Sequence, residues 1–373
     1  MKWFYGLLCL IFLIIFHEFG HFIAAKIFGV KVESFSVGFG PVLLHKTIRG
    51  TDYRLSLLPL GGYCGMKGEK DFQKALENNL PSIEADKDSL YGVHPLKRAL
   101  IGFSGPFFNY LFAIIAYSLI AGIGYSYFTY SNKIIISDEL FGSTGSVAKD
   151  AGLCTGDKII QINNSKINDF SDIIENVSTR PDEDLYIQVD RDGKILEFTV
   201  HSQLNKDSGT GKIGIAADTN DVIENHTPEY NFFEAIGNGF IEANKAVVLT
   251  FKSFKILFKG INVSKAVSGP ARVTDMLGTT VKEGFSIGIR EGFVSMFSLM
   301  GVISISLFIM NLLPVPVLDG GIILIALIET IFRKKVKPKI QYYIQFIGIA
   351  FIAILFVIGL SGDINFFINK GRH

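Results

Sequence analysis

Three residues near the amino terminus have the types and spacing of a metal site. His17 and His21 are four residues apart in the segment HEFGH, so on a helix both imidazoles project from one face, as two ligands of a single ion require. Glu18 lies beside them, free to take a proton from metal-bound water. The pattern predicts a zinc site that activates water for hydrolysis, although five residues alone are only moderately specific.

The surrounding sequence strengthens this prediction. Between residues 3 and 25, these three are the only acidic, basic or imidazole side chains in an otherwise apolar stretch. A charge at the centre of a bilayer costs about 3 kcal/mol, so three such groups need a compensating partner, and a divalent cation is one. The apolar stretch continues past His21 without the small residues of a signal-peptide cleavage site, which favours a retained membrane helix.

A catalytic zinc ion usually has three protein ligands. Between residues 292 and 328 the only ionisable side chain is Asp319, which lies toward the far end of its apolar segment, as the two histidines do in theirs. If both segments cross the membrane in the same direction, all three side chains lie at comparable depth. The alternative is that LDGG is only a turn at a helix end, with Asp319 as its capping residue.

Other residues are candidates for binding substrate. Asn311 begins the segment NLLPVPVLDGG, whose prolines and glycines should break a helix at membrane depth. It either bonds substrate backbone or an oxyanion, or serves only the helix break. Further substrate-binding candidates are Phe35 and Val37, on a predicted strand, and Asn109, in the second apolar segment.

Composition predicts a polytopic α-helical membrane protein. Of 373 residues 49% are hydrophobic, 33 are Phe, and mean hydropathy is +0.36. Four segments are apolar over the roughly 20 residues that a spanning helix needs: 3–28, 99–124, 293–328 and 342–360. The chain has 36 basic and 35 acidic residues, so it has no excess of positive charge to neutralise phosphates, and nucleic acid is not expected as a partner. Three scattered cysteines predict neither disulfides nor a cysteine zinc site.

The charges of the loops predict how the chain is oriented in the membrane. The loop after the third span is strongly basic and should be cytoplasmic; its cations are Arg333, Lys334, Lys335, Lys337 and Lys339. Four crossings then place the two chain ends and residues 125–290 outside. The candidate metal site lies near the cytoplasmic side.

The segments between the spans have patterns of their own. Residues 32–64 alternate in period two, which predicts a membrane-associated β-hairpin, either a strand edge for substrate or only a plug. Residues 69–95 are charged and irregular, typical of a mobile loop. Residues 133–201 predict a compact domain with a hairpin turning at Asp192 and Gly193. Residues 232–258 predict an amphipathic helix along the membrane or against its core.

The chain resembles the site-2 protease family of intramembrane zinc metalloproteases, in its bacterial branch of regulator of sigma-E proteases. HExxH together with NxxPxPxLDGG on a later span is highly specific as a pair. The matching pieces are HEFGH at 17–21, FSVGFGP, LLPLGGY, KRALIGFSGPFFN at 97–109, AGLCTGDKIIQIN, SGPARV at 268–273 and NLLPVPVLDGG at 311–321.

The resemblance implies a role for each part. His17, His21 and Asp319 look like the zinc ligands and Glu18 like the catalytic glutamate. Residues 133–201 look like a PDZ domain. The chain has room for one such domain, whereas the best-known members of this branch have two. The domain either filters substrates by size, binds newly formed carboxyl ends, or is inert. Implied substrates are single-span proteins already cut outside, such as anti-sigma factors, and remnant signal peptides, in a bacterial inner membrane.

The expected divisions of the chain combine these features. They are 1–28 (first span, HExxH), 29–68 (β-hairpin), 69–98 (cytoplasmic loop), 99–124 (second span), 125–220 (PDZ-like domain), 221–291 (outer amphipathic helices), 292–328 (third span), 329–341 (basic loop) and 342–373 (fourth span and tail). Two other functions stay open: a metal or proton transporter, and an inactive PDZ-bearing adaptor. The absence of an internal repeat and the glutamate beside the first histidine favour hydrolysis.

Overall fold

The computed structural model describes residues 2–142, 145–257 and 268–370. These residues fall into two compact units. The first, here the membrane unit, comprises the described residues up to 123, residues 230–247 and those from 268 onward. The second unit comprises the described residues of 124–229 and of 248–257.

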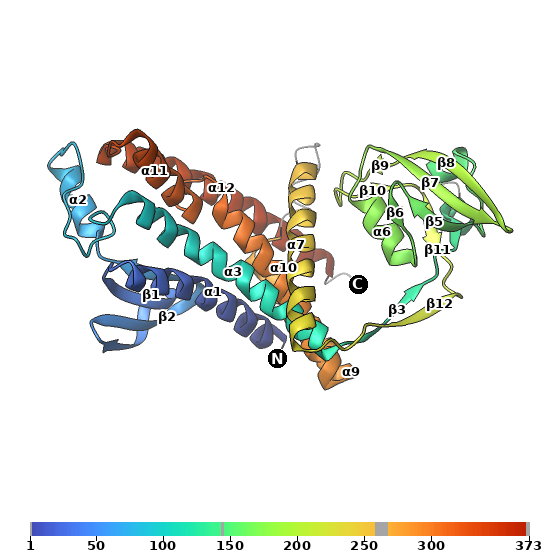
Figure 1. Cartoon of the computed structure of the whole chain (residues 1–373), viewed down its shortest axis with the longest axis horizontal. Helices are drawn as coiled ribbons and strands as arrows, with labels where there is room; N and C mark the ends of the chain where they lie inside the picture. The colour runs from blue at the N-terminus through green and yellow to red at the C-terminus, as the bar shows by residue number, and fades with distance from the viewer. Residues whose placement is uncertain (1, 143–144, 258–267, 371–373) are drawn as a thin grey trace. The chain divides into compact units, whose positions relative to one another are not determined.

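Four helices of the membrane unit are long and apolar enough to cross a bilayer. They are α1 (Lys2–Ile27), α3 (Pro95–Ile123), α10 (Ile289–Leu312) and α12 (Pro338–Lys370). Helices α1, α3 and α10 run side by side (Figure 1), and their contact is filled by buried Leu13, Phe112 and Met300. The prediction of a polytopic helical membrane protein is confirmed.

The predicted third span is two helices. Helix α10 ends at Leu312, and α11 (Asp319–Phe332) begins after an irregular stretch at 313–318. Pro314 and Pro316 remove backbone donors from this stretch, and Val317 has a φ of +87°. Asp319 is therefore the first residue of a new helix, not a residue within a continuous span.

Several expected boundaries were wrong. The loop expected at 69–98 contains helix α2 (Glu69–Glu77), because Phe72, Ala75 and Leu76 share one face and acidic residues stand in its first turn. Helices α3 and α12 each begin several residues early, at a proline, which is favoured in the first helical position. The basic loop shortens to 333–337.

The expected β-hairpin is present, and it is more folded than a simple pair. Strands β1 (Val32–Ile48) and β2 (Thr51–Met66) are antiparallel partners, but β1 bends at Gly38 and Gly40, which have φ of +90° and +84°. Residues 34–37 consequently pair with 52–55 on one side and with 62–65 on the other. Residues 34–37 are central, and the segment 62–65 is an edge.

Two further helices contribute to the membrane unit, the first of them only as far as residue 247. The expected amphipathic helix is α7 (Phe232–Leu257), with residue 258 outside the described residues; Gly239 packs closely on Ser118 of α3. Helix α9 (Pro270–Ile287) packs on α1, where Gly6 meets the Thr274 backbone. Its first turn is capped by Asp363 of α12, which accepts the Gly269 N–H at 2.8 Å.

The second unit is built on a four-stranded sheet in the order β6-β5-β7-β8. Its strands are β5 (Lys158–Ile162), β6 (Ser165–Lys166), β7 (Asp184–Arg191) and β8 (Lys194–His201), and α6 (Phe170–Ser178) covers the core. The predicted turn at Asp192 and Gly193 is confirmed, since both have positive φ. The remaining elements are β3 (Ser126–Tyr130), β4 (Ile134–Ile136), α4 (Ser137–Phe141), α5 (Val147–Asp150), β9 (Gln203–Leu204), β10 (Gly211–Lys212), β11 (Ile215–Ala217) and β12 (Val222–His226).

Strand β12 is a correction to the region expected to hold only helices, 221–291. It pairs antiparallel with β3, with Val222 opposite Tyr130 and His226 opposite Ser126. The alternation of exposed and half-buried residues along β12 is typical of a strand, and its partner lies almost a hundred residues earlier, which local periodicity does not reveal.

Candidate metal centre

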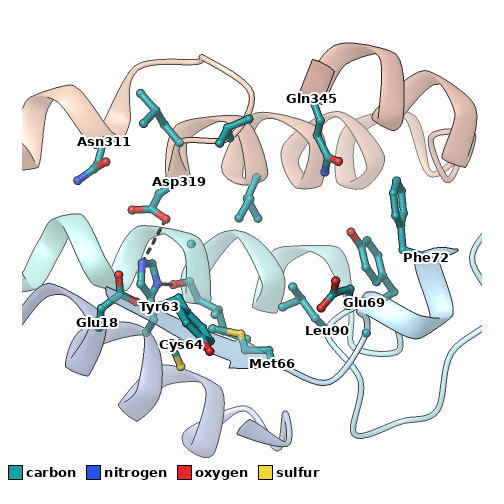
Figure 2. Close-up of a pocket in the computed structure, with 18 of the residues that line it drawn as sticks. Glu18, Tyr63, Cys64, Met66, Glu69, Phe72, Leu90, Asn311, Asp319 and Gln345 are labelled. Carbon is teal, nitrogen blue, oxygen red and sulfur yellow. Dashed lines mark hydrogen bonds and ion pairs between the residues drawn. The ribbon is translucent and has the colours of Figure 1, made fainter. Parts of the chain in front are cut away.

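Helices α1 and α11 bring His17, His21 and Asp319 together. His17 Nε2 lies 3.2 Å from one Asp319 carboxylate oxygen, and His21 Nε2 lies 3.1 Å from the other. Among the described residues this is the one group of three potential ligands whose ligating atoms all lie within 4.8 Å of one another. Figure 2 shows Asp319 above the helix that carries the histidines.

The donor set fits a divalent cation. His21 Nδ1 lies 2.8 Å from the Ile101 carbonyl oxygen, and since a carbonyl can only accept, the ring proton is on Nδ1. The lone pair of His21 Nε2 then faces a carboxylate oxygen, an arrangement of two acceptors that a cation between them stabilises. The other Asp319 oxygen, which faces His17 Nε2, is buried and has no hydrogen-bond partner. Two imidazoles and one carboxylate match the ligands of catalytic zinc.

Glycines make the close approach of these helices possible. A Cβ on Gly105 of α3 would lie 2.2 Å from His21 Nε2, and one on Gly20 would lie 2.4 Å from the Ser104 carbonyl oxygen. A Cβ on Gly320 would lie 2.1 Å from the Leu313 carbonyl oxygen. The glycines of LDGG therefore let α11 begin directly against the irregular stretch, with Asp319 turned to the histidines.

Asp319 does not act as a helix cap. The capping position of α11 is Leu318, which makes no side-chain hydrogen bond to the helix, and Asp319 is the first helical residue. The turn-only interpretation of LDGG is thus not what the fold shows. The carboxylate points across to α1 instead of back to its own backbone.

Glu18 lies next to the metal ligands and contacts the edge of the β-sheet. A Cβ on Gly62 of β2 would lie 3.3 Å from Glu18 Cγ, so the strand passes close beside the glutamate. The sheet edge and the candidate general base are therefore in direct contact.

A cavity of about 680 Å³ opens from this site. Glu18, Asn311 and Asp319 surround one end, and Phe72 of α2 and Gln345 of α12 lie toward the other (Figure 2). The β2 residues Tyr63, Cys64 and Met66 also line it. The space is elongated and bordered by a strand edge, which suits an extended peptide.

Of the other predicted site residues, only some line the cavity. Asn311 lines the cavity near Asp319. Phe35 and Val37 are not among its lining residues and lie in the central part of the sheet, paired on both sides. Asn109 is fully buried, with its Nδ2 2.9 Å from His17 Nδ1, and does not line the cavity. The contact of Ile101 with His21 is made by a backbone atom and leaves no signal in residue type.

The family model for peptidase family M50 matches residues 5–355, nearly the whole chain. The chain belongs to peptidase family M50. A protein of Treponema pallidum assigned as a zinc metalloprotease is 33% identical over 97% of this chain and 98% of its own length. Relatives with the same assignment in Campylobacter jejuni and Helicobacter pylori strain J99 are 35% and 34% identical, over 95% and 96% of this chain and 90% and 98% of theirs.

Membership of family M50 decides between the functions that the sequence left open. The resemblance to site-2 proteases is confirmed, and with it the expectation of a zinc-dependent protease. This M50 protein is a multi-pass membrane zinc metalloprotease. The transporter and the inactive adaptor receive no support from these relatives.

Proposed function

We propose that this M50 peptidase is an intramembrane endopeptidase that cleaves the transmembrane segments of single-span proteins. The observation that carries the proposal is the cluster of His17, His21 and Asp319, two of which belong to a helix that can span a bilayer. A catalytic group inside a membrane helix has access to peptide bonds at membrane depth, which an enzyme with a soluble active site does not reach.

Each residue of the cluster has a defined task in the proposed mechanism. His17, His21 and Asp319 would hold the zinc ion, which when bound lowers the pKa of water and polarises a carbonyl. Glu18 takes the proton of the attacking water and delivers it to the leaving amide nitrogen. Asn311, at the same end of the cavity, donates a hydrogen bond to the substrate carbonyl oxygen.

A helical substrate must become extended before its peptide bonds can be attacked, and the edge of β2 offers it a template. Segment 62–65 pairs with β1 on one side, and no other strand among the described residues pairs with its outer side. This edge lines the cavity, and its Gly62 lies beside Glu18. A substrate strand would therefore add to β2, not to the central residues Phe35 and Val37. The rival is that this membrane-associated hairpin only plugs the site.

The second unit supports a PDZ-like role in choosing substrates. A groove of about 510 Å³ lies between α6 and the segment 210–215, lined by Phe170, Ile173 and Val177. Such a groove suits an extended carboxyl-terminal peptide, the end that a first cut outside the membrane produces. Anti-sigma-factor-like proteins after that cut, and remnant signal peptides, are the proposed substrates.

The proposed location follows from charge. The loop 333–337 keeps three Lys and one Arg, so the positive-inside rule places it in the cytoplasm of a bacterium and the second unit outside the inner membrane. The metal centre then lies near the cytoplasmic side. The partners are the lipid bilayer and the substrate.

Glu18→Gln tests the proposal directly. The purified protein, reconstituted in vesicles with a single-span substrate whose outer part has been removed, should cleave it within the transmembrane segment. The variant should keep its zinc and lose cleavage by at least about 100-fold, the scale of general acid–base catalysis. Glu33→Gln, on an exposed residue of β1, is the control. Full activity of Glu18→Gln, or cleavage only outside the membrane segment, would disprove the mechanism.

A further inference from the structure

Asn109 is a fully buried polar residue of α3, and half of its amide has no partner. Its side chain is 0% exposed. Its Nδ2 lies 2.9 Å from His17 Nδ1, whereas its Oδ1 makes no hydrogen bond. A buried amide oxygen without a partner is unfavourable, so packing alone does not account for an asparagine here.

The chemistry of His17 explains why an asparagine stands at position 109. A histidine that binds a metal through Nε2 carries its remaining ring proton on Nδ1, and this N–H needs an acceptor. The NH2 group of an amide cannot accept it, but the oxygen can. Rotating the Asn109 amide by half a turn exchanges nitrogen and oxygen within the same space and puts the oxygen opposite His17 Nδ1.

His21 already has the equivalent partner. Its Nδ1 donates to the Ile101 carbonyl oxygen at 2.8 Å, which leaves its Nε2 lone pair directed at Asp319. Ile101 and Asn109 are eight residues apart on α3, or about two turns. One helix therefore provides the group that faces the outer ring nitrogen of each histidine, the Ile101 carbonyl for His21 and the Asn109 amide for His17.

We propose that Asn109 is a positioning residue whose amide oxygen accepts the Nδ1 proton of His17 and so keeps the Nε2 lone pair directed at the zinc site. The inference rests on the proposed ligand set and replaces the expectation that Asn109 binds substrate. The backbone around it is fixed, since Ser304 Oγ of α10 donates to the Asn109 carbonyl oxygen at 2.8 Å.

Zinc affinity of the full-length protein, measured by competition with a chromophoric chelator, tests this role. Asn109→Asp keeps an acceptor for the His17 proton and should bind zinc within a few-fold of wild type. Asn109→Leu has the same number and branching of side-chain heavy atoms but no acceptor, and should bind zinc about 10- to 100-fold more weakly. Ser118→Ala is the matched control, because that α3 hydroxyl donates to the Ile114 carbonyl of its own helix.

A second measurement keeps the test independent of folding in the variants. Nitrogen chemical shifts of the His17 ring in the zinc-loaded wild type should show a protonated Nδ1. An unprotonated Nδ1 there, or wild-type zinc affinity in Asn109→Leu, overturns the positioning role. His17→Ala separates the two proposals: if it binds zinc weakly while Asn109→Leu does not, only the positioning role fails. If it binds zinc like wild type, the ligand set itself is wrong.

Discussion

At the scale of single residues, the candidate site depends on very close packing around two histidines. His17 and His21 share a helix face, so their spacing alone brings the rings to a centroid separation of 5.0 Å. What holds them is less visible in the sequence: a backbone carbonyl for His21, an amide for His17, and glycines where side chains would collide. The metal centre is therefore sensitive to changes as small as one methyl group.

Gly105→Ala provides a test of that sensitivity. The added Cβ would lie 2.2 Å from His21 Nε2, so the ring must move away from the metal position. In the interior of an ordinary helix, replacing glycine by alanine stabilises the folded protein by about 0.5–1 kcal/mol. We expect zinc affinity and cleavage to fall by at least about 10-fold, the loss typical when a group that orients a metal ligand is disturbed, while the fold is retained.

Gly237→Ala is the matched control for this prediction. Gly237 also lies within a helix, α7, and a Cβ there would meet no atom within 4 Å. It should leave zinc affinity and cleavage as in wild type. Equal behaviour of the two variants would show that the Gly105 contact does not constrain the site.

At the scale of elements, each part of the site is held by contacts at both of its ends. Helix α11 starts against the irregular stretch at Gly320 and is tied near its other end, where buried Glu329 pairs with Arg98 of α3 and accepts the Val336 N–H at 2.7 Å. The bent strands of the β-sheet likewise put the 62–65 edge against Glu18. The sheet thus forms part of the wall of the cavity at the candidate site.

Two substitutions at Cys64 test the strand edge. Cys64→Ala keeps the backbone N–H at this edge position, whereas Cys64→Pro removes it and blocks strand addition at that point. We expect the alanine variant to cleave like wild type and the proline variant to lose cleavage by about 10-fold or more, the cost of one lost hydrogen bond to the substrate strand. Zinc content should be normal in both. Near-normal cleavage by Cys64→Pro would favour the plug interpretation.

At the scale of the whole molecule, the two units have different kinds of core. The membrane unit is a helical bundle with a buried polar cluster. The second unit has its own core around a four-stranded sheet, with buried Ile159, Leu185 and Ile187. The chain runs into residues 132–220 from β3 and out of them into β12, and these two strands pair with each other. Beside this pair the Ser131 N–H donates to the Asp221 carbonyl oxygen at 2.9 Å. That pair is a suitable place to remove the domain.

Replacing residues 132–220 by an Asn-Gly turn should release the proposed substrate filter. Ser131 and Asp221 are already hydrogen-bonded neighbours, and Asn-Gly is the preferred two-residue turn between antiparallel strands. We expect zinc content to be unchanged and cleavage of substrates with intact outer domains to rise severalfold relative to cut substrates. Unchanged selectivity would mean that the second unit does not act as a filter.

Much of this protein could be predicted from its sequence because membranes and helices impose simple rules. Long apolar segments identify the spans, the spacing of His17 and His21 identifies a shared helix face, and depth singles out Asp319. These signals are local or one-dimensional. Helix α2 was missed because a short amphipathic segment within a charged stretch carries little pattern.

Only the tertiary structure decided how these parts meet. The strand β12, the two-sided pairing of Phe35 and Val37, and the burial of Asn109 against His17 all depend on residues far apart in the chain. The contact of Ile101 is made by a backbone atom, which every residue type possesses. The sequence alone could therefore predict which three candidate ligands come together, whereas the groups that orient them become evident only when helices and strands are packed, because orientation is a property of contacts and not of composition.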